Sequence, residues 1–258
     1  APLDLVYFAG THEDYVRQID AALNESDVSL ARRRIEFAHA NTWNDRMMEM
    51  DRAMRRTTPL VSVIVLTHNS EAFLPEFHRY FIKNTAWPNW ELIYADNCSS
   101  DATPDILTGF AAGDPRVSAL LLDRNLGFAG GNNAAVKQAS GEYLIFQNPD
   151  TVVTHGWVHR LLAPLMKDPK VGMSAPVTNH SGNQTRIEVS YSGAAEMEEF
   201  AASLARASHG QTLEVPTAPL LCAAIRRQTW QQVGELDTRF EVGMFEDDDY
   251  GLRLKQAG

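Results

Sequence analysis

The strongest constraint on the fold of this chain is a set of four short apolar runs in its central part. The runs are LVSVIVLT (60–67), ELIYAD (91–96), VSALLLD (117–123) and EYLIFQN (142–148). The stretches between them, such as EAFLPEFHRYFIKN and TPDILTGFAA, have room for helices. Near-continuous apolar strands that alternate with helices are typical of a parallel sheet covered on both faces. The sequence therefore predicts an α/β fold with a mainly parallel central sheet.

The first 57 residues follow a different pattern. LDLVYFA (3–9) is apolar and bounded by Gly10, which predicts a strand. Thr11 suits the N-cap of a first helix, and further helices are expected over SLARRRIEFAHA and from about Asn44 onward. Pro59 then ends the helical pattern, because the residue before a proline avoids the helical conformation. We therefore expect an extension of one strand plus helices over 1–57 and an α/β domain over 58–258.

The last helix of this extension carries a stripe of methionines. Met47, Met50 and Met54 lie on one side at helical spacing. Flexible methionine side chains fill irregular gaps in protein cores. We therefore expect this stripe to pack against other residues and not to form a ligand surface.

Composition excludes several classes of protein. The 258 residues carry a formal net charge of -10, which argues against charge-driven nucleic-acid binding. Two cysteines, Cys98 and Cys222, form neither a disulfide framework nor a CxxC zinc site, so a reducing compartment is the simplest expectation. The sequence has no apolar run of the roughly 18 residues that a membrane span requires. The N-terminus lacks the basic region of a signal peptide and an initiator Met, and we expect the chain to be a piece of a longer protein.

Polar clusters follow all four apolar runs. They are Thr67-His68-Asn69, Asp96 to Asp101, Asp123-Arg124 followed by NLGFAGGNN (125–133), and Asn148 to Thr151. Each cluster alone is explained by the chemistry of turns. In an open parallel sheet, however, ligands bind beyond the carboxyl ends of the strands, and four clusters at one edge predict a ligand site there.

The residue types in these clusters suit a phosphate-bearing ligand and a metal ion. Asp96 closes a strand, where its carboxylate is placed to accept hydrogen bonds from a nucleobase or a ribose. Asp150 follows a stiffening proline, which suits Mg²⁺ or Mn²⁺, ions that take one or two carboxylates and complete their shell with phosphates and water. The glycines of 125–133 allow close approach to a ligand, and the start of the following helix favours an anion.

Four consecutive acids, Glu246 to Asp249, precede a further helical pattern near the end of the chain. Acids at a helix N-terminus are favourable by a few tenths of a kcal/mol each, so this alone is one explanation. Four adjacent carboxylates nevertheless repel one another. The use of one as a general base, with others orienting it, is a reason to tolerate that repulsion.

Six ordered segments resemble family 2 glycosyltransferases. The segments are VSVIVLTHN, ADNCSSDAT, RNLGFAGGNNAAV, LIFQNPDTVV, LLCAAIRRQTWQQVGELDTRF and FEDDDYGLRLKQAG, and the resemblance covers residues 60–258. They are most similar to bacterial members that build rhamnose- or galactofuranose-type surface polysaccharides. The resemblance implies a Rossmann-like GT-A fold and transfer of a sugar, with inversion, from a nucleotide-diphosphate-sugar to an acceptor hydroxyl. It also implies a divalent cation, Mg²⁺ or Mn²⁺.

The same resemblance assigns roles to residues at matching positions. It places the catalytic base at Asp247, with Glu246 and Asp249 beside it, and the metal ligand at Asp150. It implies that Arg253 helps to neutralise the acidic run. The metal motif opens with Asn148 in place of the usual Asp, so metal affinity is expected to depend on the bound diphosphate. The implied nucleotide- and donor-binding residues are Thr67, Asn69, Asp96, Asn97, Asn125, Gly127, Phe128, Gly131, Asn133 and Asn148.

The resemblance also sets expectations for partners and extent. The acceptor is expected to be a glycan or lipid-linked glycan, and the protein cytoplasmic, with peripheral association of the full-length protein at the inner face of the membrane left open. Family members continue beyond the position of Gly258, so we expect a C-terminally truncated domain with weak turnover. Residues 1–57 resemble the C-terminal helices of a GT-B glycosyltransferase, with a helical linker as the alternative.

Two other functions stay open from the sequence, a non-catalytic nucleotide- or carbohydrate-binding module and a metal-dependent nucleotidyltransferase. The glycine-rich, basic loop usual in nucleotidyltransferases is absent, because THNSEAFLPEF occupies its place after the first strand. The same loop lacks the GxGxxG pattern of a dinucleotide-dependent oxidoreductase.

Overall fold

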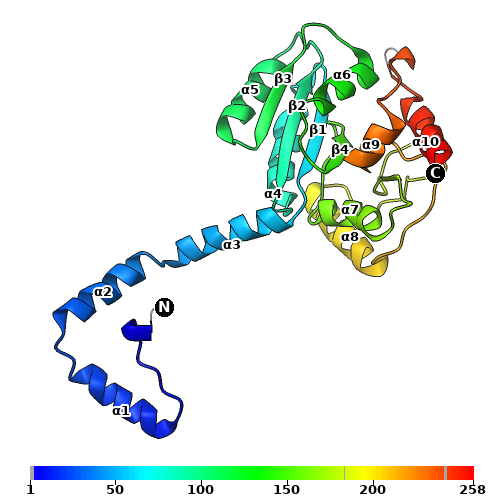
Figure 1. Ribbon diagram of the computed structural model, residues 1–258. Coiled ribbons are helices and arrows are strands. Elements are labelled where there is room, and N and C mark those ends of the chain that lie inside the picture. The colour runs from blue at the N-terminus through cyan, green and yellow to red at the C-terminus, as the bar shows by residue number, and fades with distance from the viewer. Residues whose placement is uncertain (1–2, 183, 241–242) are drawn as a thin grey trace. The chain divides into compact units, whose positions relative to one another are not determined.

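The computed structural model describes residues 3–182, 184–240 and 243–258, and it divides into two units between Thr57 and Thr58 (Figure 1). The first unit contains the 3-10 helix η1 and three α-helices. Their bounds are η1 Leu3–Leu5, α1 His12–Leu23, α2 Val28–His39 and α3 Trp43–Thr57. In the part of the chain that the structure describes, no helix is both long and apolar enough to cross a membrane.

Local capping explains where the helices of the first unit begin. The Thr11 side chain accepts a hydrogen bond from the Asp14 backbone N–H at 3.1 Å, which confirms the predicted N-cap. Asp27 caps α2 in the same way, accepting from the N–H groups of Ser29 at 2.8 Å and Leu30 at 3.2 Å. The charge-assisted bonds of Arg34 to Glu25 at 2.6 Å, and to the Leu5 carbonyl at 2.9 Å, tie η1 to α2.

Two expectations for this unit are wrong. Residues 3–5 form a 3-10 helix, and the expected strand over 3–9 is absent. A strand needs a neighbour for its backbone N–H and C=O groups, and the described part of this unit offers none. The methionine stripe is also not packed, because Met47, Met50 and Met54 are 69%, 63% and 47% exposed.

The second unit is built on one six-stranded sheet. The strands are β1 Val61–Thr67, β2 Trp90–Asp96, β3 Val117–Leu121, β4 Tyr143–Gln147, β5 Met173–Ser174 and β6 Cys222–Arg226. Their order is β3-β2-β1-β4-β6-β5, in which β1 to β4 are mutually parallel and β6 pairs antiparallel with both β4 and β5. All four predicted strands are therefore confirmed, in a mainly parallel sheet.

Helices cover both faces of this sheet. They are α4 Leu74–Asn84, α5 Thr103–Gly113, α6 Gly127–Val136, α7 Trp157–Lys167, α8 Ala194–Ala207, α9 Arg227–Val233, the 3-10 helix η2 Thr238–Phe240 and α10 Glu246–Ala257. Val63 and its neighbours on one face of β1 pack with Phe77 of α4 and Leu161 of α7. Ile64, on the other face, belongs to a core with Trp230 of α9 and Tyr250 of α10. This alternation explains why the strands read as continuous apolar runs.

A buried polar contact fixes the start of β4 against β1. Glu91 Oε1 accepts hydrogen bonds from the Ser62 hydroxyl at 2.5 Å and the Ser140 N–H at 2.6 Å. The Ser62 hydroxyl accepts from the Gly141 N–H at 2.7 Å. A Cβ on Gly141 would lie 2.5 Å from the Ser62 backbone nitrogen and 2.8 Å from the Leu60 oxygen. Position 141 therefore admits only glycine without a backbone shift.

We predict that Gly141→Ala lowers the free energy of unfolding by about 1–3 kcal/mol, the usual cost of overpacking. Gly109→Ala is the matched control, because a Cβ there meets no atom within 4 Å in the exposed middle of α5. That control should raise the free energy of unfolding by about 0.5–1 kcal/mol, since alanine is the better helix former. Urea denaturation of the two variants measures both effects, and equal stabilities would contradict the packing at Gly141.

Candidate active site

A cavity of about 750 Å³ opens at the carboxyl edge of β1, β2 and β4. Its volume lies within the range of small-molecule sites in proteins. Loops that follow β1 to β4 supply its lining, which consists of Leu66 to Ser70, Phe73, Asn97, Arg124 to Phe128 and Asn148 to Asp150. The polar clusters predicted from the sequence therefore do come together at one edge of the sheet.

Asn97 connects three of these loops. Its side-chain oxygen accepts from the Leu126 N–H at 2.8 Å, and its amide nitrogen donates to Asn125 Oδ1 at 2.8 Å and to the Gly127 carbonyl at 3.1 Å. Its backbone N–H donates to the Thr67 carbonyl at 2.8 Å. The side chain is buried, so these bonds form in a poorly solvated position where they are strong. Asn97 thus shapes the loop that begins α6.

Asp96 and Asn69 order the loop after β2. The Asp96 carboxylate accepts from the Ser99 N–H at 2.9 Å and from the Ser99 hydroxyl, and it is 2% exposed. Asn69 has a φ of 50°, which asparagine tolerates better than most residues, and its side-chain oxygen accepts from the Ser100 N–H at 2.9 Å. The loops after β1 and β2 are therefore held together by side chains. Asp96 itself does not line the cavity.

The glycine-rich segment divides into residues that face the cavity and residues that pack the core. Gly127 has a φ of 71° and lines the cavity with Asn125 and Phe128. A Cβ on Gly131 would lie 2.4 Å from Leu66 Cδ1, so this glycine permits the close approach of α6 to β1. Asn133 is buried and exchanges hydrogen bonds of 2.8 and 3.0 Å with the Leu236 backbone. Gly131 and Asn133 lie outside the cavity lining, and the contacts that they make are with protein.

Asp150 lies at the cavity on a turn that its neighbours hold. The Thr151 hydroxyl donates to the Asn148 carbonyl at 2.7 Å and accepts from the Gln147 side chain at 3.0 Å. Asp150 is exposed, and no described residue engages its carboxylate. No group of three or more His, Cys, Asp or Glu suited to a metal occurs among the described residues. The donor set, one free carboxylate with Asn148 beside it, fits a hard cation that takes most of its ligands from phosphate and water.

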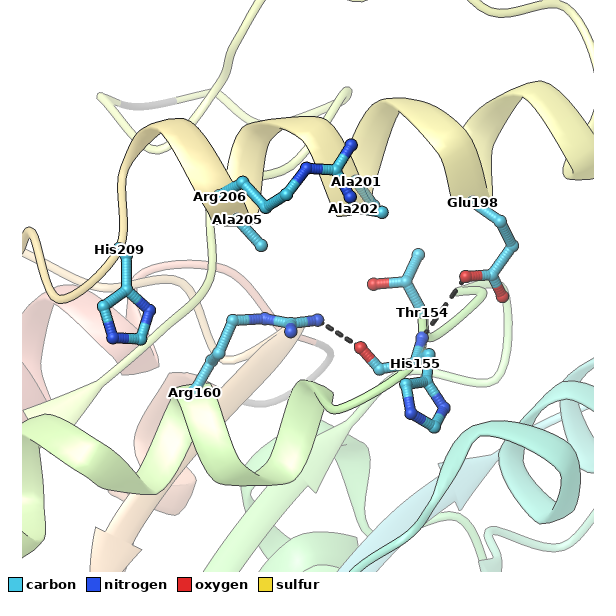
Figure 2. A pocket seen from close by; sticks show the side chains of 9 residues that line it. All are labelled: Thr154, His155, Arg160, Glu198, Ala201, Ala202, Ala205, Arg206 and His209. Atoms are coloured by element: carbon cyan, nitrogen blue, oxygen red, sulfur yellow. Dashed lines mark hydrogen bonds between the residues drawn. The ribbon is translucent and has the colours of Figure 1, made fainter.

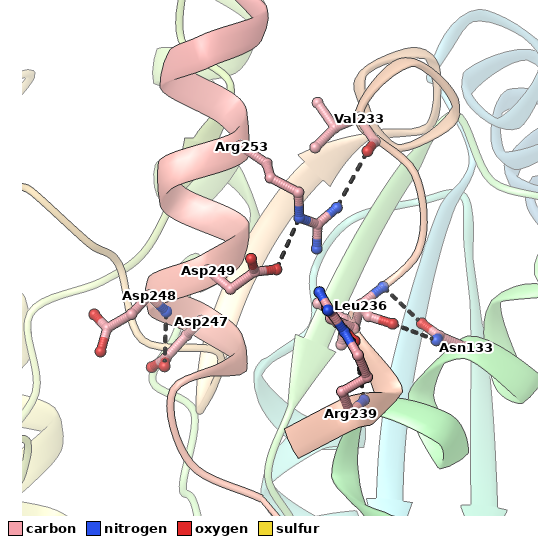
Figure 3. A network of polar contacts seen from close by, with 9 residues as sticks. Asn133, Val233, Leu236, Arg239, Asp247, Asp248, Asp249 and Arg253 are labelled. Carbon is pink, nitrogen blue, oxygen red and sulfur yellow. Dashed lines mark hydrogen bonds and ion pairs between the residues drawn. The ribbon is translucent and has the colours of Figure 1, made fainter. Parts of the chain in front are cut away.

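The acidic run forms the first turn of α10, and Figure 3 shows that Asp247, Asp248 and Asp249 have different surroundings. Asp249 pairs with Arg253 at 2.7 Å, and Arg253 also donates to the Val233 carbonyl at 3.1 Å, which fixes α10 to the end of α9. Among the described residues, the Asp247 carboxylate accepts a single hydrogen bond, from the Asp248 N–H at 3.0 Å. Asp248 is exposed. The ion pair therefore occupies one acid and leaves Asp247 available.

Burial raises the pKa of the two acids at the start of this helix. Burial, and then the charge of Asp247, raise the pKa of Glu246, whose Oε2 has no hydrogen-bond partner among the residues that the structure describes. Burial, and then the charge of Asp248, raise the pKa of Asp247. A Cβ on Gly243 would lie 3.5 Å from Phe128 Cβ and 3.7 Å from Glu246 Oε1, so the helix begins beside the cavity wall. A carboxylate with a raised pKa is a better general base.

One lining residue, Phe73, was not expected at the site. The sequence indicates only that 71–84 has room for a helix, and within that stretch α4 begins at Leu74. Pro75 in the first turn is the signal that marks this later start, because proline suits the first helical positions. Phe73 therefore precedes the helix, is 51% exposed, and reaches the cavity edge.

We predict that the stability gained by Glu246→Gln depends on pH. Below the unfolded pKa of about 4.3, Glu246 is protonated in both states and the replacement is nearly neutral. As pH rises from there toward the raised folded pKa, the unfolded state ionises first, so the native protein loses stability that glutamine retains. Thermal unfolding should therefore show a larger advantage of Glu246→Gln at pH 7 than at pH 4. Glu199→Gln, at an exposed position of α8, is the control, and a pH-independent difference for Glu246→Gln would contradict the burial effect.

Known proteins share both the sequence pattern and the fold. TuaG of Bacillus subtilis (strain 168), named as a teichuronic acid biosynthesis glycosyltransferase, is 35% identical over 97 residues, which are 38% of this chain and 38% of TuaG. The O-antigen biosynthesis protein RfbC of Myxococcus xanthus is 29% identical over 217 residues, 79% of this chain and 16% of RfbC. The chain thus spans less than half the length of these relatives.

Solved structures show the same fold at low identity. The mannosyltransferase PcManGT from Pyrobaculum calidifontis, in complex with GDP-Man and Mn²⁺, matches with a TM-score of 0.56 and 20% identity over 76% of this chain and 52% of its own. GalNAc-T7 with UDP, GalNAc and Mn²⁺ gives a TM-score of 0.62 and 16% identity over 79% of this chain and 41% of its own. The Glycosyl transferase family 2 pattern matches residues 62–233. The chain therefore belongs to glycosyltransferase family 2, and its second unit has the Rossmann-like GT-A fold.

Proposed function

We propose that residues 58–258 carry the donor site and catalytic base of a metal-dependent, inverting glycosyltransferase. The donor is a nucleotide-diphosphate-sugar, and the acceptor is a hydroxyl of a glycan or lipid-linked glycan. The observation that carries this proposal is the 750 Å³ cavity, which contains the unengaged Asp150 and lies beside the acids of α10. The names of TuaG and RfbC support a role in bacterial surface polysaccharide synthesis, and we propose that this role is performed in the cytoplasm or at the inner face of the membrane.

The loops suit the diphosphate part of such a donor. Asn97 and Asn125 hold the backbone around Gly127 at the start of α6, where free N–H groups favour an anion. In a chain of net charge -10, a polyphosphate also needs a positive charge beside it. Asp150 and Asn148 would hold a divalent cation there, as Mn²⁺ accompanies the nucleotide ligands named for PcManGT and GalNAc-T7. Thr67 and Asn69 line the cavity and would position the nucleoside, whereas the buried Asp96 does not line it and would act only by holding the loop after β2.

Asp247 is the residue that we assign to the acceptor. Its carboxylate takes the proton of the acceptor hydroxyl while that oxygen forms a bond to the anomeric carbon. The bond from that carbon to the donor diphosphate breaks, and its electron pair goes to the phosphate oxygen. A divalent cation, when bound, stabilises the charge that develops on this leaving group. Attack from the face opposite the leaving group inverts the configuration at the anomeric carbon. The base and the metal site must therefore lie on opposite sides of that carbon.

The other two acids of the motif support Asp247. Asp249 is taken by Arg253, so we assign it the positioning of α10 against α9. Glu246 is buried beside Gly243 at the cavity wall, and its pKa is raised. The charge of Asp247 adds to the burial that raises the pKa of Glu246, and the charge of Asp248 adds to the burial that raises the pKa of Asp247.

We predict that the chain binds UDP, dTDP or GDP in the presence of Mn²⁺ and that Asp150→Asn weakens this binding at least tenfold, about 1.4 kcal/mol. The reason is the loss of the free carboxylate that holds the cation. Isothermal titration with and without Mn²⁺ measures the effect. Asp105→Asn, which removes the same charge from the exposed first turn of α5, should leave affinity unchanged. Failure of every nucleotide to bind under either condition would refute the donor site.

We predict that, in the full-length protein, Asp247→Asn lowers the rate of sugar transfer at least 100-fold, within the range for loss of a general base, and spares nucleotide affinity. Release of nucleoside diphosphate from a nucleotide-sugar measures the rate, and titration measures the affinity. Asp248→Asn is the control, because this exposed neighbour carries the same charge. Transfer that survives in Asp247→Asn, or that is lost equally in Asp248→Asn, would show that the base is another residue.

A further inference from the structure

A second hollow of about 450 Å³ lies between α8 and the segment that leads into α7 (Figure 2). It shares no lining residue with the cavity at the strand ends. Arg160 of α7 faces Arg206 of α8 across it, and His155 and His209 lie near its two ends. Four basic or titratable nitrogen side chains thus line one concavity of an acidic protein.

The charges of both arginines are left without a counter-ion. The Arg160 guanidinium donates to the His155 carbonyl, and Arg206 Nη2 donates to the Ser203 hydroxyl at 3.1 Å. Neither forms an ion pair with any residue in 3–182, 184–240 or 243–258. Arg116 and Arg253, by contrast, pair with aspartates at 2.7 Å. Two uncompensated guanidinium groups therefore face the same space.

Glu198 is the single carboxylate of the lining, and it is already engaged. Its Oε1 accepts from the Asn84 side chain at 2.5 Å, and its Oε2 accepts from the His155 N–H at 3.3 Å. These bonds join α8 to the end of α4 and to the loop before α7. Glu198 therefore holds the hollow together, and the two arginines exceed it in charge.

The sequence also provides room for the arginines and for a ligand. Gly156 has a φ of 73°, and a Cβ there would lie 3.0 Å from Arg160 Nη1, so glycine lets the guanidinium rest against the backbone. On α8, the residues that face the hollow beside Glu198 and Arg206 are Ala201, Ala202 and Ala205. Larger side chains at these positions would fill the space between the helices.

We propose that this hollow binds a diphosphate group. Guanidinium groups bind phosphoryl oxygens through paired, charge-assisted hydrogen bonds. Arginines on two facing helices suit a ligand with two adjacent phosphoryl groups. The same chemistry is present in free diphosphate and in a prenyl diphosphate, and the hollow is open enough to admit either. This inference does not rest on the proposed function, because no residue of the donor cavity takes part in it.

The probe is inorganic pyrophosphate, titrated into the whole chain in EDTA so that no metal contributes. Arg160→Gln and Arg206→Gln should each weaken binding at least tenfold, and Ala202→Leu should weaken it without changing the charge. Arg79→Gln is the control, because this arginine is exposed on α4 and lies near Glu76. Asp150→Asn and saturating UDP should leave pyrophosphate affinity unchanged.

Absence of pyrophosphate binding, or wild-type affinity in both arginine variants, would overturn the proposal. Displacement of pyrophosphate by UDP would also overturn it, because the probe would then occupy the donor cavity. Arg160 and Arg206 are exposed, so their variants test the site even where Ala202→Leu disturbs folding. Geranyl diphosphate identifies the source within the proposal, since tighter binding than pyrophosphate indicates a lipid-linked ligand and equal binding indicates the free anion.

Discussion

The cavity depends most on the hydrogen bonds of the Asn97 side chain. Parallel strands bring their carboxyl ends to one edge of a sheet. The loops beyond the strands, however, lack the regular backbone hydrogen bonds that join the strands. Asn97 supplies that order, because its buried amide bonds to Asn125, Leu126 and Gly127, and its N–H bonds to Thr67. An apolar residue of similar size would leave these backbone groups without partners in a poorly solvated place. These hydrogen bonds therefore order the loops of the cavity, whereas the apolar core stabilises the sheet from which the loops extend.

Much of the fold follows from the sequence because local and tertiary requirements agree there. Each run that became β1 to β4 is apolar on both faces, and both faces are covered. The short strands β5 and β6 lack such a signal, since CAAIR is five residues rich in alanine and pairs antiparallel through contacts distant in sequence. LDLVYFA has the composition of a strand but no partner, and it forms a 3-10 helix at Leu3–Leu5. Composition gives a segment the tendency to form a strand, whereas a neighbouring strand to pair with decides whether the strand forms.

The same limit applies to the site. The sequence places polar clusters at the strand ends, and Asn69, Asn97, Asn125, Gly127 and Asp150 do line one cavity. It cannot separate Gly127 from Gly131, or Asn125 from Asn133, because the difference lies in distant partners. Gly131 accommodates Leu66 of β1, and Asn133 binds the backbone of Leu236, 103 residues away. Motif residues thus divide into those that shape the cavity and those that seat its helix, and only the packing shows which is which.

The distribution of charge underlies both anion sites that we propose for this acidic chain. The acids of α10 are not equivalent, because Arg253 neutralises Asp249 while burial raises the pKa of Glu246 and Asp247. In the lining of the cavity, the Asp150 carboxylate is not engaged by any described residue and suits a cation. The hollow between α7 and α8, for which we propose diphosphate binding, contains positive charge instead, because Arg160 and Arg206 form no ion pair with any described residue. The net charge of -10 therefore describes the whole chain, whereas the proposed anion sites depend on a few local charges.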